Sequence, residues 1–370
     1  DLKRHVSGIV SRFAYMGTHA DFALYTAEIV PSLWLLTLGK DRVIYQNMPA
    51  PDIVSAVLKE FGITFELRLS GTYATREYCV HYDESAFDFI SRLLEDEGIF
   101  YYFEHSDGTH KLVLADSNST FAPCTNAATL YMRENTSNLG DTNALQRFEQ
   151  NERLVIKTHA VDDYNYLTPS TDHLAKVDGQ AVNRCLDYEY PGRYLTVSEG
   201  AARASIRVQE HQSDRELGVG ESRCPHLVPG TRFKLEDHPR SALNADHIVR
   251  SVQHFADLEK YQNSLETAPH DVRYRPPRKT RRPVVMGNHT ATVVGPAGEE
   301  IHVDEWGRIK VHFHWDRRGG GDTSCWLRTM QAWGGEGWGT QFIPRVGMEV
   351  VVAFEGGDPD CPIVLGCVGN

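Results

Sequence analysis

The last quarter of the chain, residues 289–370, restricts the possible fold more than any other stretch. Short apolar runs such as 309–313 and 350–352 are separated by turns rich in Gly, Pro and Asp. Five of the six tryptophans also lie here, namely Trp306, Trp315, Trp326, Trp333 and Trp338. Short alternating strands between turn residues are typical of small antiparallel barrels. We therefore predict a closed β-barrel over 289–370.

A proline- and arginine-rich segment, 273–283, separates this region from the rest of the chain. Its sequence is RYRPPRKTRRP, and prolines this dense disfavour both helix and sheet. The segment is basic within an acidic chain, so it is either a solvated extended linker or an electrostatic docking site. We favour the solvated linker, because charge runs are usually solvated, and we predict a domain boundary here.

The first hundred residues predict strands followed by two helices. Runs 6–13 and 22–30 alternate and flank a turn at 17–21. A hairpin of this kind needs more sheet to be stable. Ile53, Val54, Val57 and Leu58 form a helical stripe over 51–61, and Gly62 ends it. After this helix we predict a strand at 78–82, a helix at 85–97 and a hairpin of 99–104 with 111–114.

The middle of the chain has weaker patterns. Residues 115–150 are polar and predict a loop-rich segment, and 153–157 and 185–190 predict strands. A mostly exposed helix is predicted over 198–212, and strands return at 232–235 and 247–254.

Bulk composition excludes several classes of protein. The net charge of −12 argues against a general nucleic-acid binder, which needs a positive field. No run of about 18 apolar residues exists, so no transmembrane helix is expected. The seven cysteines contain no CxxC pair, and we interpret them as reduced thiols of a protein made in a cytosol.

Two groups of residues suggest binding sites, one for a metal ion and one for single-stranded nucleic acid. His312 and His314 share a strand face, and with His302 and Asp304 they could bind a metal. We favour ordinary strand residues, because no third ligand is well placed. Five basic residues among the tryptophans could bind single strands: Arg308, Lys310, Arg317, Arg318 and Arg328. We favour a structural role, in which the tryptophan rings fill the core of a small barrel and cover its outer face, because the chain is acidic.

Acidic clusters and a glycine-rich loop are the other candidates. Glu95, Asp96 and Glu97 end a predicted helix, and neighbouring acids on a helix point in different directions, so we expect a solvated helix end rather than a hydrolase pair. The segment 358–360, Asp-Pro-Asp, predicts a turn. The loop 334–339 has no Lys and no following helix, so we expect a mobile turn rather than a phosphate cradle. No G-x-S-x-G, H-E-x-x-H or Walker motif is present. We predict no catalytic, cofactor or metal residues.

Several segments together carry a family resemblance. They are 67–73 (LRLSGTY), 76–80 (REYCV), 87–99 (FDFISRLLEDEGI), 294–301 (VGPAGEEI), 304–311 (DEWGRIKV), 313–317 (FHWDR) and 356–360 (GGDPD). The chain resembles the VgrG proteins, also described as Rhs-element Vgr proteins, which are the spike components of type VI secretion systems. The similarity extends over essentially the whole chain.

The resemblance implies a mainly β fold with an α/β portion, in which phage tail hub-like barrel domains precede an OB-fold barrel. It implies partial N-terminal hub barrel strands at 1–48, an α/β hub portion at 49–150 and a second hub barrel with return strands at 151–272. A Pro/Arg-rich linker at 273–288 and the needle-proximal OB-fold at 289–370 follow. Family members have further strands before the position of Asp1 and a needle beyond Asn370, and we expect this chain to lack both.

The resemblance also implies partners and a place of action. We expect a homotrimer that sits on a tube of Hcp protein at the hub base, a PAAR-repeat protein on the missing needle, and effector proteins as cargo. The target membrane would be punctured rather than stably bound, and no nucleic acid or cofactor is implied. Such proteins are made in the bacterial cytoplasm, assembled in the apparatus and secreted into the target cell or medium. The alternatives are an OB-fold nucleic-acid-binding protein and a spike-associated cell-wall hydrolase.

Overall fold

The computed structural model describes residues 4–19, 22–133, 142–319, 323–335 and 337–369. The chain divides into two units, each with its own hydrophobic core. Unit 1 comprises Asp1–Ser32, Gly62–Thr72 and Leu94–Lys279, and unit 2 comprises Leu33–Phe61, Tyr73–Leu93 and Thr280–Asn370. Among the described residues, no helix combines the length and hydropathy that a membrane span requires.

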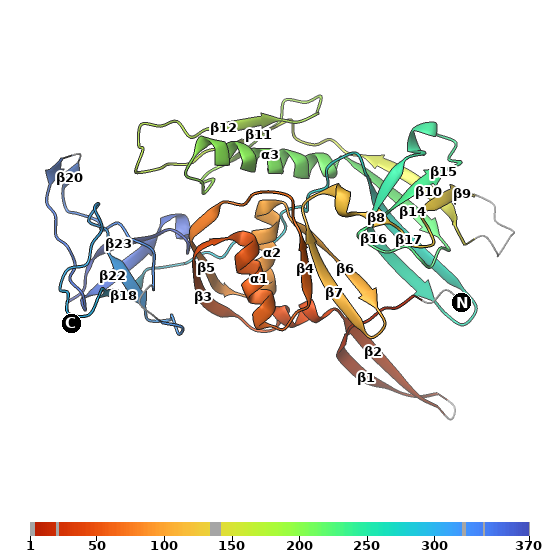
Figure 1. The fold of residues 1–370 in the computed structure, drawn as a ribbon, viewed down its shortest axis with the longest axis horizontal. Helices are drawn as coiled ribbons and strands as arrows, with labels where there is room; N and C mark the ends of the chain where they lie inside the picture. The colour runs from red at the N-terminus through yellow and green to blue at the C-terminus, as the bar shows by residue number, and fades with distance from the viewer. Residues whose placement is uncertain (1–3, 20–21, 134–141, 320–322, 336, 370) are drawn as a thin grey trace. The chain divides into compact units, whose positions relative to one another are not determined.

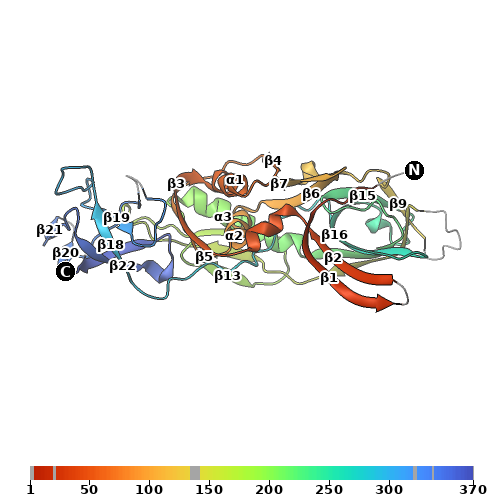
Figure 2. The same ribbon diagram turned by 90° about the horizontal axis from the view of Figure 1, so that it is seen from below.

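Unit 1 begins with an antiparallel hairpin of β1 (Ile9–His19) and β2 (Phe22–Val30) (Figure 2). The two strands pair with each other alone among the described strands, and most of their side chains are exposed. Strand β1 continues to His19, so residues 17–19 are in a strand and not in the predicted turn 17–21. The last two positions of that turn, 20–21, lie outside the described residues.

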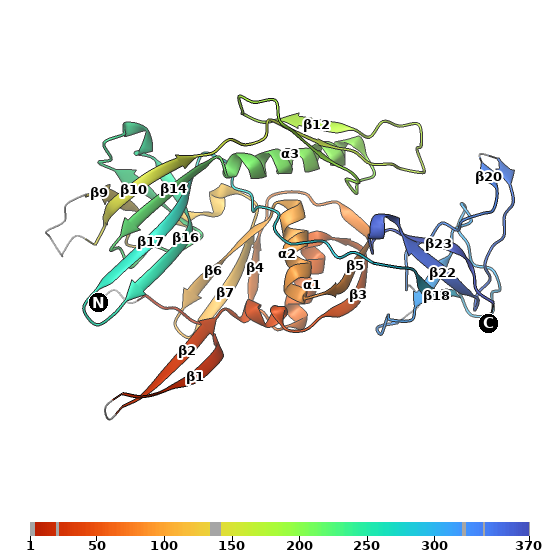
Figure 3. The same ribbon diagram turned by 180° about the vertical axis from the view of Figure 1, so that it is seen from behind.

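A closed six-stranded barrel forms the main core of unit 1 (Figure 3). Its strands, in order around the barrel, are β16 (Asp246–Ala256), β17 (Tyr261–Pro269), β14 (Glu216–Ser222), β10 (Ala144–Glu152), β9 (Thr129–Met132) and β15 (Thr231–Glu236). Pairing of β15 with β16 closes the ring, and the short β8 (Ala122–Pro123) lies beside β15. Phe148, Phe233 and Leu265 fill its interior.

The strands of this barrel correct two predictions and confirm two others. The stretch 115–150 is not loop-rich, because β9 and β10 build two walls of the barrel; its residues 134–141 lie outside the described part. The predicted strands at 232–235 and 247–254 are confirmed as β15 and β16. The predicted strand 153–157 was wrong, because β10 ends at Glu152 and Leu154 is exposed to solvent.

Two smaller sheets complete unit 1. Strands β4 (Phe65–Arg68), β7 (Thr109–Ala115) and β6 (Phe100–Ser106) form one, which confirms the predicted hairpin. Strands β12 (Ala175–Asp178), β11 (Thr158–Val161) and β13 (Leu186–Glu189) form the other, and α3 (Val197–Ser213) lies along it (Figure 1). Helix α3 starts with a capping box of Thr196 and Glu199. Its position confirms the predicted helix, but not the expected exposure, since Ala204, Arg207 and Val208 are buried.

The segment that follows the barrel is extended and only partly solvated. Arg275 is 7% exposed and donates through Nε to Gln209 Oε1 at 2.9 Å. Arg278 pairs with Glu189 at 2.8 Å. The expectation of a solvated linker was therefore wrong for Arg275, whose donors find acceptors within unit 1, whereas Arg273, Arg278 and Lys279 are exposed as expected.

Unit 2 contains an α/β part and a small barrel. Helix α1 (Ala50–Glu60) begins with Pro51 in its first turn and buries the predicted stripe, which confirms the helix. It packs beside β3 (Asp41–Pro49), which pairs with β5 (Thr75–Glu84) and so confirms the strand at 78–82. Helix α2 (Ala86–Glu97) extends from unit 2 into unit 1. Among the described residues, short 3₁₀ helices lie at Ser32–Thr37 and Glu355–Gly357, and within unit 1 at Asn118–Thr120 and Ser241–Leu243.

The small barrel is built on β19 (Lys310–Phe313), β18 (His289–Val294), β22 (Glu349–Phe354) and β23 (Pro362–Cys367), in that order. Leu327 bridges to Ile309 beside one edge, and Thr329 bridges to Val364 on the other. The segment 327–329 therefore connects the two edges, which confirms the predicted closure. A two-stranded hairpin of β20 (Gly334–Gly335) and β21 (Trp338–Gly339) belongs to the same region.

Candidate assembly surfaces

The predicted metal candidates do not converge. His312 Nε2 lies 3.2 Å from the carbonyl oxygen of Asp316, and His314 faces Glu349 at 3.7 Å. His302 instead packs against the ring of Trp326. Asp304 binds Arg308 Nε at 2.5 Å. Within the residues that the structure covers, no group of three or more potential ligands could hold a metal ion.

The acidic end of α2 is packed rather than solvated, which corrects the prediction. Asp96 is 5% exposed. Arg207 Nη2 donates to the carbonyl oxygens of Glu95 and Asp96 at 2.8 and 2.7 Å. These bonds satisfy carbonyl groups that a helix end leaves without partners, and they place a cation where the helix dipole is negative.

The other two loops carry structural roles. Residues 358–360 form a turn, as predicted, but Asp360 is not exposed: its Oδ1 accepts the N–H of Val80 at 2.6 Å, and burial raises the pKa of its carboxyl group. The loop 334–339 forms the β20–β21 hairpin, and Glu336 lies outside the described residues.

The basic residues among the tryptophans are mostly paired with acids. Arg308 pairs with Asp304, Arg317 with Asp41, Arg318 with Glu60 and Arg328 with Glu355. Lys310 lies over the ring of Trp326, 5.2 Å from its centroid. These pairings lower the net positive field that a nucleic acid would need.

Three groups of exposed apolar side chains stand out instead. The hairpin surface comprises Val10, Phe13, Tyr15, Tyr25 and Ile29 on β1 and β2. Phe13 and Tyr25 stack with ring centroids 5.4 Å apart, and each is more than half exposed. Since an isolated two-stranded hairpin is marginally stable in water, this apolar surface is suited to a partner.

The β13 surface comprises Leu186 and Tyr188 on the strand and Tyr190 directly after it, at alternate positions. The intervening Asp187 and Glu189 face the buried His159, at 3.1 and 3.7 Å. Strand β13 is an edge strand of its sheet among the described strands. An edge strand with exposed aromatic side chains favours association with another chain. The alternation of apolar and acidic residues over 186–190 was the available signal in the sequence.

The loop surface comprises Met330, Trp333, Trp338 and Phe342 in unit 2, which are between 55% and 73% exposed. The rings of Trp333 and Trp338 contact each other, with centroids 5.0 Å apart. By contrast, Trp315 stacks on Phe313 in the core. Trp315 thus packs against the barrel core, whereas Trp333 and Trp338 form part of an exposed patch.

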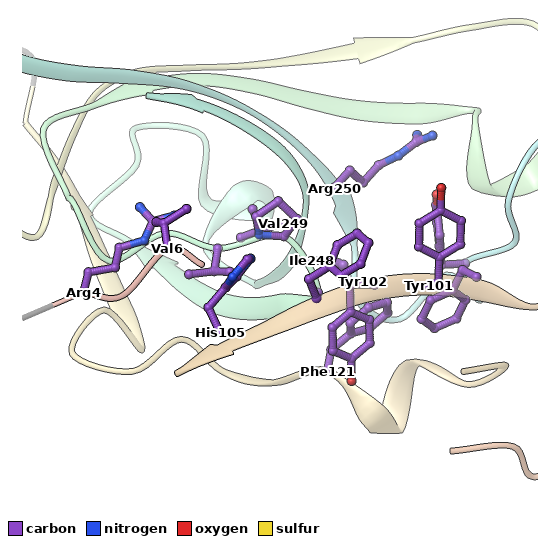
Figure 4. A pocket seen from close by; sticks show the side chains of 15 residues that line it. Arg4, Val6, Tyr101, Tyr102, His105, Phe121, Ile248, Val249 and Arg250 are labelled. Atoms are coloured by element: carbon purple, nitrogen blue, oxygen red, sulfur yellow. The ribbon is translucent and has the colours of Figure 1, made fainter. Parts of the chain in front are cut away.

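A cavity of about 310 Å³ lies in unit 1 between β6 and β16 (Figure 4). Buried aromatic residues such as Phe121 and Tyr102 line one side, and Ile248 and Val249 line the other. Gly230, with φ of 84°, lets the loop 228–230 approach Tyr102: a Cβ here would lie 2.3 Å from the ring. The sequence carried no local sign of this cavity, because its walls come from distant segments.

Comparison with known proteins places the chain in a family. Residues 1–260 match the family described as phage tail baseplate hub (GPD), and residues 293–368 match the type VI secretion system/phage-baseplate injector OB domain. These matches and the closed barrel confirm the predicted fold class of hub-like barrels followed by an OB-fold.

Individual proteins with similar sequences support the same family. Type VI secretion system spike protein VgrG1b of Pseudomonas aeruginosa is 36% identical over 385 residues, which cover 100% of this chain and 52% of that protein. VgrG4b of the same organism is 36% identical over 394 residues, with 98% and 48% covered. The chain therefore spans about half the length of these curated relatives.

Among solved structures, the E. coli c3393 protein is similar in fold. It is described as a component of the type VI secretion system with structural similarity to T4 bacteriophage tail proteins gp27 and gp5. The TM-score is 0.71 at 23% identity, and the match covers 98% of this chain and 83% of that one. As the resemblance of its sequence motifs indicated, the chain belongs to the phage tail baseplate hub family, with the type VI secretion system spike proteins VgrG as its relatives.

Proposed function

We propose that this chain is a structural component of the membrane-puncturing spike of a type VI secretion system. In this proposal residues 1–272 form the hub, 273–288 the connection and 289–370 the collar of a homotrimer. The observation that carries it is the order of the two family matches along one chain, a baseplate hub followed by an injector OB domain. Puncture is mechanical work, so the role needs no catalytic residue and no cofactor.

The exposed apolar surfaces support self-assembly. An aromatic side chain buries about 150–250 Å² when covered. The three aromatic residues of the loop surface are 55% to 73% exposed, so together they offer roughly 400 Å². A standard interface buries about 800 Å² per partner. The loop surface alone thus supplies about half of one interface, and the hairpin and β13 surfaces offer further apolar area on unit 1.

The partners in this proposal are those of a spike. The trimer sits on a tube of Hcp protein at the hub base, a PAAR-repeat protein binds beyond the collar, and effector proteins travel with the assembly into target cells. The protein is made in the bacterial cytoplasm, assembled in the secretion apparatus and secreted into the target cell or medium. It punctures the target membrane and does not remain bound to it.

Light scattering coupled to size exclusion tests the trimer. We expect a mass three times the 41.7 kDa of one chain. A monomer at every concentration up to the solubility limit would contradict self-assembly through these surfaces. In the producing bacterium, deletion of the gene should abolish secretion of the tube protein, and the intact gene should restore it. Salt-dependent binding of single-stranded DNA would instead favour an OB-fold nucleic-acid-binding protein.

A further inference from the structure

The cavity between β6 and β16 has a charged group at each end and an apolar middle. Figure 4 shows Arg4 and His105 at one end, and Arg250 and Tyr101 at the other. Ile248 and Val249, each 1% exposed, lie between them. A cavity of this form fits an elongated ligand rather than a spherical ion.

The size of the cavity limits the ligand. A dry apolar cavity of about 150 Å³ holds one benzene ring. The volume here is about 310 Å³, which is at the lower end of ligand-binding pockets, roughly 300–1,000 Å³. A ring with a short side chain, or a branched alkyl group of similar size, therefore fits. Phe100 and Phe121, whose rings stack with centroids 4.9 Å apart, provide a flat apolar wall for it.

The two arginines are not equivalent. Arg250 Nη1 pairs with Asp214 at 3.0 Å, and its guanidinium lies over the ring of Tyr274 at 5.2 Å. Its charge is therefore already compensated. Arg4 Nη1 donates to the carbonyl oxygen of Pro225 at 2.8 Å and contacts His254 Nε2 at 2.9 Å. In the described part of the chain no carboxylate pairs with Arg4.

The neighbouring histidines do not change this picture. Burial lowers the pKa of His105 and of His254, and the charge of Arg4 lowers both further. Both rings are therefore neutral at neutral pH, and Arg4 carries the positive charge at this end of the cavity. An arginine has five N–H donors, and among the described contacts Arg4 uses Nη1 alone. Its remaining donors are available to an anionic group.

We propose that this cavity binds a small apolar carboxylate, with an aryl or branched alkyl group between β6 and β16 and the carboxylate on the guanidinium of Arg4. Two sources present this chemistry: a free organic acid, and the C-terminal residue of a polypeptide with its α-carboxylate. The inference rests on the cavity alone and does not depend on the proposed spike function.

Titration calorimetry with matched probes tests the charge. The probes are 3-phenylpropionate and its neutral analogue 3-phenylpropanamide. We expect the acid to bind about tenfold more tightly, because a hydrogen bond to a charged partner is the stronger kind. Arg4→Gln should reduce the affinity for the acid to that for the amide. Arg12→Gln, an exposed arginine on β1, is the matched control and should leave both affinities unchanged.

A blocking variant tests the location. Val6 lines the cavity mouth and is 68% exposed, so Val6→Trp should abolish binding without disturbing the core. Val182→Trp, at a valine that is 95% exposed and outside the cavity, is the control. Unchanged thermal unfolding of both variants confirms that they fold. Binding that survives Val6→Trp would overturn the assignment of the site.

A second pair of probes identifies the source. The tripeptide acetyl-Gly-Gly-Phe is compared in its free-acid and C-terminally amidated forms. Tighter binding of the free-acid peptide than of 3-phenylpropionate supports a polypeptide C-terminus, and the reverse order supports a free organic acid. Equal affinity for acid and amide in both pairs, or no binding of any probe at millimolar concentration, overturns the proposal.

Discussion

Arg275 Nη1 lies 2.8 Å from the carbonyl oxygen of Gly98, the residue that follows the last residue of α2. The Arg207 contacts to the carbonyl oxygens of Glu95 and Asp96 and this bond give donors to carbonyl groups at and just beyond the end of the helix. Two arginines that are distant in the sequence thus hold one helix end within unit 1.

Replacement of Arg275 by methionine should destabilise the protein by about 2–4 kcal/mol, because buried acceptors lose a charged donor. Arg273→Met is the matched control. Arg273 is exposed and donates to the carbonyl oxygen of Asp116 at 3.0 Å, so its loss should cost at most about 1 kcal/mol. Urea unfolding measures both variants. Equal free energies of unfolding for the two would show that the bonds of Arg275 contribute little.

Gly230→Ala should be more costly than the same change at another glycine with positive φ. At Gly230 the new Cβ would lie 2.3 Å from the ring of Tyr102, whereas at Gly108, with φ of 71°, nothing lies within 4 Å. Both variants carry a left-handed backbone cost of about 1–2 kcal/mol. The steric clash should raise the cost at Gly230 by at least about 1 kcal/mol more. Thermal unfolding compares them, and a Gly108→Ala variant as unstable as Gly230→Ala would contradict the clash.

Acid should weaken the sheet of β4, β6 and β7 in part through the carboxylate of Glu66. Hydrogen bonds from Arg68 and Lys111 lower the pKa of Glu66 from 4.5 to about 2. A carboxylate with a lowered folded-state pKa stabilises the fold above its unfolded pKa and loses this contribution as the pH falls from 4.5 towards 2.

Glu66→Gln should therefore flatten the decrease in stability over this pH range. Chemical unfolding at pH 5, 4 and 3 would measure the change. Glu259→Gln, in the exposed turn between β16 and β17, serves as control and should keep the wild-type slope. A wild-type slope in the Glu66 variant would mean that this carboxylate does not contribute to acid sensitivity.

Trp338→Glu should weaken self-association at least tenfold, because it places a charge in the loop surface and removes apolar area that a partner would cover. Sedimentation velocity gives the association constant. Leu258→Glu is the control, since Leu258 is fully exposed in the turn between β16 and β17 and lies outside the three surfaces. If Trp338→Glu assembles as the wild type does, the loop surface is not part of the interface.

Helices and strands that are specified by the spacing of neighbouring residues could be predicted from the sequence. The stripe of α1 repeats at helical spacing, and Gly62 follows it with φ of 67°. The strands of the small barrel alternate and are separated by turn residues. Their pattern therefore predicted a closed barrel before any pairing was known.

Features that depend on distant partners could not be predicted in this way. Strand β9 is only four residues long, and it becomes a strand by pairing Leu130 with Leu235, far along the chain. Asp96 and Arg275 looked solvated because charged residues usually are. Their burial depends on backbone groups of segments that a local pattern does not reveal. The cavity has the same origin, since its walls come from β6 and β16.

Among the described strands, the six of the barrel in unit 1 form a closed ring, so none of the six leaves a ladder side without a partner strand. Its ladders are nevertheless unequal: β16 and β17 share nine pairs, whereas β9 has two pairs with β10 and three with β15. Rupture under load should therefore begin between β9 and β10, whose two pairs form the shortest described ladder of the ring. A protein exposed to sudden axial force would open at this seam first and keep its longer ladders intact.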